Sequence, residues 1–80
     1  MKVKERGSPQ SDELRQLLLE RRQRAKLTQR ELADRLGWDP KVISNLERGA
    51  KRMTVLELIS ISKALEFDPA AAIRRVMKRT

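Results

Sequence analysis

The chain has 80 residues, of which 19 are Lys or Arg and 11 are Asp or Glu, and its formal net charge of +8 favours polyanionic partners, with nucleic acid or an anionic membrane surface leading. The absence of Cys and His excludes disulfides and thiolate metal sites and removes the commonest metal ligand and general base, so we expect no cofactor, no metal and no enzymatic activity. No apolar run approaches the roughly 20 residues that a membrane span needs, and residues 1–10 lack the apolar core of a secretory signal, so we expect a soluble, cytoplasmic protein.

Residues 1–10 differ in character from the rest of the chain. They carry Lys and Arg together with Gly7 and Pro9, and we expect them to form a flexible basic arm. Either this arm contributes to binding or it is an ordinary frayed terminus. Residues 11–80 have the length of one small domain, and we expect the folded core there.

The first predicted helix begins at Ser11. A serine at this point can cap a helix whose first turn carries Asp12 and Glu13, and acidic side chains are favourable at a helix N-terminus. Apolar residues then recur at helical spacing and predict its buried face. These residues are Leu14, Leu17, Leu18 and Ala25.

Residues 28–37 predict a second, short helix. Thr28 and Glu31 have the spacing of a capping box, in which each side chain accepts a hydrogen bond from the other residue's backbone amide. Gly37 suits the left-handed position that ends a helix. The inward-facing residues are predicted to be Leu32, Ala33 and Leu36.

Asp39 and Pro40 predict the start of a third helix. Asp can cap it, and Pro fits the first helical position because its missing N–H would be unpaired there in any case. Gly49 is expected to end this helix. Its apolar stripe consists of Val42, Ile43 and Leu46.

Two further helices complete the predicted fold. Thr54 and Glu57 form a second capping box, and Asp68-Pro69 repeats the start with Asp and Pro. No segment alternates with the period of two that a half-buried strand would show, so the sequence predicts a compact, all-α bundle of five helices. The predicted core-facing residues are Val55, Leu58, Ile61, Ser62 and Leu65 in the fourth helix and Ala72, Ile73 and Val76 in the fifth.

The second and third helices have the residue spacing of a helix-turn-helix. Counting from the first residue of the second helix, Ala33 is fifth, where the next helix crosses closely, and Gly37 is ninth, where the turn requires a positive φ. Ile43 and Leu46, the fifteenth and eighteenth residues, fix the third helix in the core. The opposite face of that helix, residues 40–48, is then free to enter a DNA major groove, which is wide enough for one helix.

Several short segments fall into one pattern: Thr28-Gln29, Glu31-Leu32-Ala33, Leu36-Gly37, Ile43-Ser44, Leu46-Glu47-Arg48-Gly49 and Leu58 through Leu65. At these residues the chain resembles the phage-repressor/Cro helix-turn-helix domains of the XRE family, from Leu14 to about Val76. The resemblance implies a lambda-repressor-like fold, with residues 40–48 as the recognition helix. It also implies a transcriptional regulator, a repressor in the simplest case, whose partner is double-stranded DNA.

The resemblance also implies roles for individual residues. Gln29 resembles the residue that touches a phosphate and braces the recognition helix. Arg22 and Glu47 resemble the internal ion pair that links the first and third helices of the family, and this pair is structural. Arg48 and the loop over residues 49–52 resemble contacts to the DNA backbone.

Two positions depart from the family pattern. Pro40 stands where many members have a polar base-reading residue, and a proline cannot make a bidentate base contact, so base reading shifts to its neighbours. Trp38 stands in the turn, where a smaller residue is common. It covers the edge of the core, lies against the sugar-phosphate backbone, or does both.

Polar residues on the outer face of the third helix are the candidate base contacts. Lys41 can donate to guanine, Asn45 can pair with adenine, and Ser44 can serve either base. Flanking residues are candidates for phosphate contacts, which position a protein without reading sequence. They are Gln29, Arg30, Arg48, Lys51 and Arg52. The alternative for both sets is an ordinary solvated surface.

Leu56, Ile59 and Met77 lie off the predicted core stripes. A cluster of exposed apolar residues marks an interface, and a homodimer would place two recognition helices about one DNA turn apart. Scattered surface apolar residues are the alternative. The same fold also serves as a protein-interaction module, such as an antitoxin or a bridging factor, and this is the alternative function. We expect no small-molecule substrate.

Overall fold

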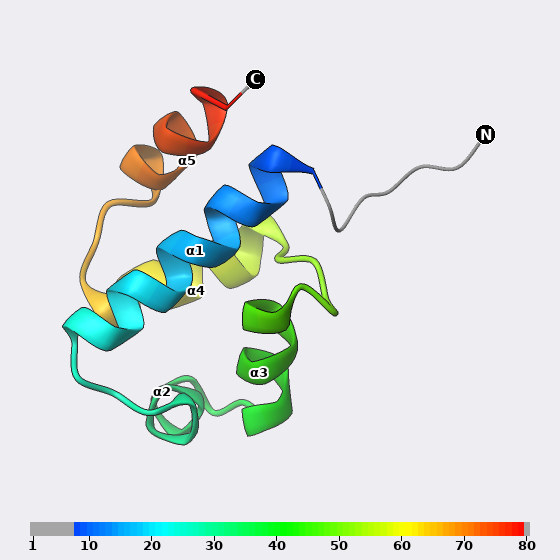
Figure 1. The fold of residues 1–80 in the computed structure, drawn as a ribbon. Coiled ribbons are helices and arrows are strands. Elements are labelled where there is room, and N and C mark those ends of the chain that lie inside the picture. The colour runs from blue at the N-terminus through cyan, green and yellow to red at the C-terminus, as the bar shows by residue number, and fades with distance from the viewer. Residues whose placement is uncertain (1–7, 80) are drawn as a thin grey trace.

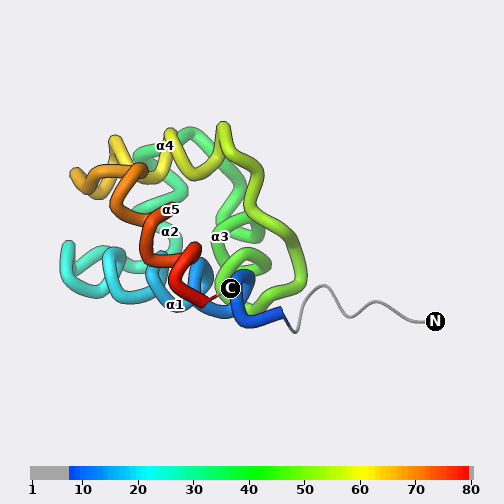
Figure 2. Tube along the Cα trace, turned by 90° about the horizontal axis from the view of Figure 1, so that it is seen from above, coloured from blue at the N-terminus to red at the C-terminus, as the bar shows by residue number. Residues whose placement is uncertain are grey.

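Five α-helices make up the part of the chain that the computed structural model describes, residues 8–79. They are α1 (Pro9–Arg24), α2 (Gln29–Leu36), α3 (Pro40–Arg48), α4 (Val55–Leu65) and α5 (Pro69–Met77). In Figure 1, α1 crosses the centre with α4 behind it, α5 lies above it, and α2 and α3 lie below. Figure 2 shows α5 reaching from the end of α4 toward α1, and it contacts both helices. The predicted all-α fold of five helices is confirmed, and none of these helices is long and apolar enough to cross a membrane.

Helix α1 begins earlier than predicted. Ser8 is its cap, and the Ser8 hydroxyl accepts a hydrogen bond from the Ser11 amide at 3.1 Å. The predicted start at Ser11 was therefore wrong, and Pro9 and Gln10, assigned to the arm, lie in the first turn of the helix. The fixed φ of proline suits the first helical position, which favours Ser8 as the cap. The rest of the predicted arm, residues 1–7, lies outside the described residues.

Both predicted capping boxes are present. Thr28 Oγ1 accepts from the Glu31 amide at 3.0 Å, and Glu31 Oε1 accepts from the Thr28 amide at 2.8 Å. Thr54 and Glu57 repeat this arrangement at 3.0 and 2.8 Å. The hydrogen bonds from Thr28 to the Glu31 carboxylate lower the pKa of Glu31. The other two helix starts are capped by Asp and followed by Pro, as predicted: Asp39-Pro40 and Asp68-Pro69.

The core consists of two clusters of buried side chains. The larger joins α1, α2, α3 and α4, and its buried members are Leu18, Leu32, Ala33, Ile43, Leu46, Ile61 and Leu65. The smaller joins α1, α4 and α5 through Leu17, Leu58 and Ala72. Because α5 contributes only Ala72 to the buried residues, it is attached by much less apolar area than α2 and α3 are.

Three residues predicted to face the core are exposed instead. Ala25 follows the last turn of α1 as its C-cap, so the helical face no longer continues there. Val55 is the first residue of α4 and projects beyond the end of the packed region, and Ile73 lies on the outer side of α5. Helical periodicity fixes the direction of a side chain, but a partner must also cover it, and none does so here within residues 8–79.

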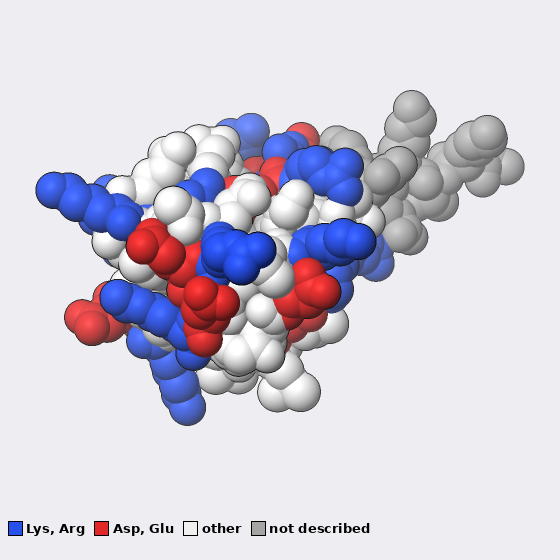
Figure 3. Space-filling view, turned by 90° about the horizontal axis from the view of Figure 1, so that it is seen from below, with Lys and Arg blue, Asp and Glu red and all other residues white. Residues whose placement is uncertain are grey.

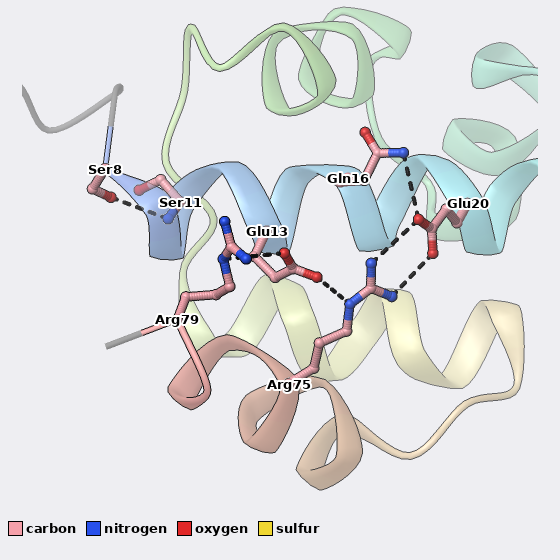
Figure 4. A network of polar contacts seen from close by, with 7 residues as sticks. All are labelled: Ser8, Ser11, Glu13, Gln16, Glu20, Arg75 and Arg79. Carbon is pink, nitrogen blue, oxygen red and sulfur yellow. Dashed lines mark hydrogen bonds and ion pairs between the residues drawn. The ribbon is translucent and has the colours of Figure 1, made fainter.

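Ionic contacts hold α5 against α1 (Figure 4). Arg75 bonds to Glu13 through Nε and to both carboxylate oxygens of Glu20, at 3.0 and 3.2 Å. Arg79 adds a contact to Glu13 at 3.6 Å. We refer to Glu13, Glu20 and Arg75 as the Arg75 cluster. The hydrogen bonds from Arg75 are the main reason that the pKa of Glu20 lies below its ordinary value.

Candidate nucleic-acid interface

The turn between α2 and α3 is set by Gly37. Its φ of 71° lies in the left-handed region that glycine adopts without strain. The Gly37 amide donates to Asp34 O at 3.2 Å and the Trp38 amide to Ala33 O at 2.9 Å, which are the two hydrogen bonds of a Schellman motif. Figure 1 shows α2 nearly end-on and α3 from the side, so this short turn makes the two helix axes cross steeply.

Helix α3 has one buried and one outer face. Asp39 caps it by accepting from the Lys41 amide at 2.9 Å, and Pro40 occupies the first helical position. Ile43 and Leu46 are buried in the larger core cluster. These two side chains fix the rotation of α3 about its own axis, and that rotation determines which residues face outward.

A buried carboxylate ties α3 to α1 and α2. Glu47 accepts from Arg22 Nε at 2.6 Å and Nη2 at 3.0 Å, and from Gln29 Nε2 at 2.8 Å. Arg22 Nη1 also donates to Leu27 O at 2.8 Å. The side chains of Arg22 and Glu47 are only 13 and 6% exposed. We refer to Arg22, Gln29 and Glu47 as the Glu47 cluster, which links the three helices at one point.

The three candidate base contacts lie on the outer side of α3. Lys41 is exposed, and Ser44 and Asn45 are partly exposed. The structure therefore places them together on the face opposite the core. Arg48, a candidate phosphate contact, reaches back along the helix and donates a hydrogen bond from Nη2 to Asn45 Oδ1.

The remaining phosphate candidates differ in their surroundings. Arg30 is exposed on α2, whereas the side-chain amide of Gln29 already donates a hydrogen bond to Glu47. Lys51 is ion-paired with Glu57 at 2.7 Å, and its ammonium also donates to Arg52 O at 3.2 Å. Burial raises the pKa of Glu57, but hydrogen bonds from Lys51 and Thr54 outweigh it and lower the pKa overall. To bind a phosphate, Lys51 would therefore have to give up its ion pair with the Glu57 carboxylate.

Trp38 and Arg15 complete the surroundings of α3. Trp38, one of the departures from the family pattern, packs against the larger core cluster. Arg15, which sequence reasoning missed, bonds to Asp12 at 2.7 Å and to the Glu47 carbonyl at 3.4 Å. Its guanidinium lies over Gly49, where a Cβ would come within 3.3 Å of Arg15 Nε. No local pattern signals this contact, because Arg15 and Glu47 are 32 residues apart.

Charges of both signs are mixed on this side of the molecule. Figure 3 views it from below, where α2 and α3 lie in Figure 1, and shows Lys and Arg interspersed with Asp and Glu. The exposed carboxylates of α2 and the following turn are Glu31, Asp34 and Asp39. Carboxylates repel phosphates, so a DNA backbone laid against this face would be held by individual cations and not by a uniformly positive surface.

The candidate dimer residues lie on other parts of the surface. Leu56 and Met77 are 76 and 65% exposed, and Ile59 is also exposed. Val55 and Ile73 add to the exposed apolar residues of α4 and α5. The three predicted residues are therefore part of a larger set than the sequence indicated.

Comparison with known proteins identifies a family. The sequence model of the family HTH_3, described as helix-turn-helix, matches residues 18–71, which contain α2, the turn and α3. No curated protein shows a significant match to the chain. Within residues 8–79, no group of three or more acidic side chains gathers in a way that would hold a metal ion.

Proposed function

The chain belongs to the helix-turn-helix family HTH_3, of the XRE/Cro/CI type, which implies DNA binding in transcriptional regulation, and from this premise we propose that it is a sequence-specific cytoplasmic repressor. The observation that carries the proposal is that α3 is anchored on one side and presents polar residues on the other. Ile43, Leu46 and Glu47 fix its inner side, while Lys41, Ser44 and Asn45 lie on its outer side. A fixed helix with polar residues facing outward is what a major groove, about 12 Å wide, accepts.

The proposed binding mode divides the contacts into two sets. Residues 40–48 enter the major groove, where Lys41, Ser44 and Asn45 read base edges. The phosphate contacts set the position and orientation of the protein without reading sequence. We assign them to Gln29, Arg30, Arg48, Lys51 and Arg52. Repression then requires only that the bound domain occupies its operator.

We propose further that the protein binds as a homodimer. The exposed apolar residues Leu56, Ile59 and Met77 support this, because a symmetric interface removes such surface from water. Two recognition helices then read half-sites about one helical turn, roughly 34 Å, apart.

The direct test is selection of bound duplexes from a random pool at about 150 mM salt. We expect a palindrome whose half-sites are about ten base pairs apart. Lys41→Ala should lose discrimination among sequences, whereas Lys51→Ala should weaken all sequences about equally. Weak binding to every duplex without any enriched sequence would contradict the proposal.

Salt dependence provides a second, independent measurement. If several phosphates are neutralised, affinity for the selected duplex should fall by roughly an order of magnitude or more when the salt concentration rises a few-fold. Affinity that does not change with salt would exclude the proposed phosphate contacts.

A protein-interaction module is the second candidate function, and the exposed apolar residues of α4 and α5 are the observation that favours it. In that case Leu56 and Met77 contact a different protein. A 1:1 complex with an unrelated protein, abolished by Leu56→Glu, would support this candidate over the homodimer.

A further inference from the structure

Three polar residues form one stripe on the outer face of α3. Lys41, Asn45 and Arg48 are four and three residues apart, the spacing that brings side chains together on one side of a helix. Ile43 and Leu46 occupy the opposite, buried side. In the proposed complex, Lys41 and Asn45 of this stripe face base edges, and Arg48 continues the stripe toward the DNA backbone.

The amide oxygen of Asn45 already has a partner. Arg48 donates a hydrogen bond from Nη2 to Asn45 Oδ1. A guanidinium has donors and no acceptor, so the amide atom that faces it must be the oxygen. Asn45 therefore turns its oxygen toward Arg48, along the helix, and leaves its NH₂ group, with two donors, for a base.

Lys41 has the same preference for acceptors, because an ammonium group offers three donors and no acceptor. In the major groove guanine presents two acceptors, N7 and O6, whereas adenine presents the acceptor N7 and the donor N6. We infer that Lys41 and Asn45 select guanine at two positions of the operator, with Arg48 as the positioning residue that orients the Asn45 amide. This inference rests on the proposed function and replaces the adenine pairing expected for Asn45 from its residue type alone.

The spacing of the two guanines follows from helix geometry. Four residues of α-helix rise about 6 Å, and successive bases of one strand are about 3.4 Å apart. Lys41 and Asn45 therefore face bases that are at most about two steps apart. At the position that faces Asn45, adenine would bring its amino group against the Asn45 NH₂ group and leave donors unpaired, so replacing guanine by adenine should weaken binding about tenfold.

The experiment measures the ratio of affinities for two duplexes that differ only at one position. Selection with the full chain first identifies the preferred operator, and Asn45→Ala identifies the position that Asn45 faces, because discrimination disappears there alone. Fluorescence anisotropy at fixed salt then compares guanine with adenine at that position. Lys63→Ala is the control, because Lys63 is an exposed residue of α4 to which no DNA contact is assigned.

Arg48→Met and Arg48→Lys separate positioning from general affinity. Loss of a phosphate contact weakens both duplexes equally and leaves their ratio unchanged. Arg48→Met releases the Asn45 oxygen, so we expect the roughly tenfold preference for guanine to disappear or to turn into a preference for adenine. Arg48→Lys retains a donor near Asn45 Oδ1 and should retain most of the preference. Arg48 is exposed, so both variants should fold.

The outcomes distinguish this inference from the function on which it rests. A wild-type protein that enriches adenine opposite Asn45, or an Arg48→Met variant with an unchanged ratio, overturns the inference and leaves sequence-specific binding intact. A wild-type protein that enriches no sequence overturns both.

Discussion

Two clusters of charged residues connect helices in this protein, and they differ mainly in burial. The Glu47 cluster joins α1, α2 and α3, and its ion pair is 13 and 6% exposed. The Arg75 cluster joins α1 to α5, and its side chains are more exposed: 37% for Arg75, 39% for Glu20 and 19% for Glu13. Both clusters have charged groups at hydrogen-bond distance, so contact geometry alone does not show which cluster contributes more to stability.

The difference shows how burial decides the energetic role of an ion pair. Water and salt screen an exposed pair, and its loss leaves charges that water can solvate. A buried pair has little net value over apolar residues, but the loss of one partner strands a charge away from water. We therefore expect a rigid connection at the proposed DNA-reading helix and a weaker, salt-sensitive connection at α5.

Among the variants that test this contrast, Arg22→Met should reduce the stability of the fold most. It leaves the Glu47 carboxylate nearly buried with Gln29 as its remaining side-chain partner, and we expect a loss of about 3–5 kcal/mol in the free energy of unfolding. Urea unfolding followed by circular dichroism measures this loss.

The control for that prediction removes both charges. Arg22→Met combined with Glu47→Leu should recover most of the stability, because no charge then remains buried. If the single variant lost less than about 1 kcal/mol, the Glu47 cluster would behave like a surface pair and the contrast with the Arg75 cluster would fail.

Arg75→Met should have a smaller effect. The exposed cluster is expected to contribute roughly 1 kcal/mol, most of which should be screened at about 1 M salt. Amide hydrogen exchange should show faster opening of α5 with little change in α3, since α5 contributes only Ala72 to the buried residues. A loss that persists at high salt would show instead that packing, and not charge, holds α5.

The smallest expected effect is the loss of stability at low pH that comes from the Arg75 cluster. The folded protein holds the pKa of Glu20 below its ordinary value of 4.5, chiefly through the hydrogen bonds from Arg75. The resulting stabilisation is therefore fully present above pH 4.5 and is lost as the pH falls through the lower pKa of the folded state.

Unfolding measured between pH 7 and pH 3 tests this linkage, with Arg75→Met as the matched control. The lowered pKa values of Glu31 and Glu57 act in the same direction in both proteins, so they cancel in the comparison. We expect a shallower acid-dependent loss in the variant. Parallel curves would mean that the Glu20 carboxylate is not stabilised by Arg75 in solution.

Most helix boundaries were predictable because capping is local. Thr28 and Glu31 exchange hydrogen bonds across three residues, so their spacing in the sequence is sufficient evidence for a helix start. The start of α1 was mispredicted because two serines, Ser8 and Ser11, can both serve as caps, and Pro9 decides between them. The contact between Asn45 and Arg48 also lies within reach of sequence reasoning, since the residues are one turn apart.

The sequence by itself determined the five helices, the turn at Gly37, the two faces of α3 and the family, because each depends on residues within a few positions of one another or on a fixed residue spacing. Only the tertiary structure decided that Arg75 meets Glu13 and Glu20, which are 62 and 55 residues away. It also decided which apolar residues stay exposed. Such contacts depend on how whole helices pack against one another, and helical periodicity fixes the direction of a side chain without specifying what that side chain will meet.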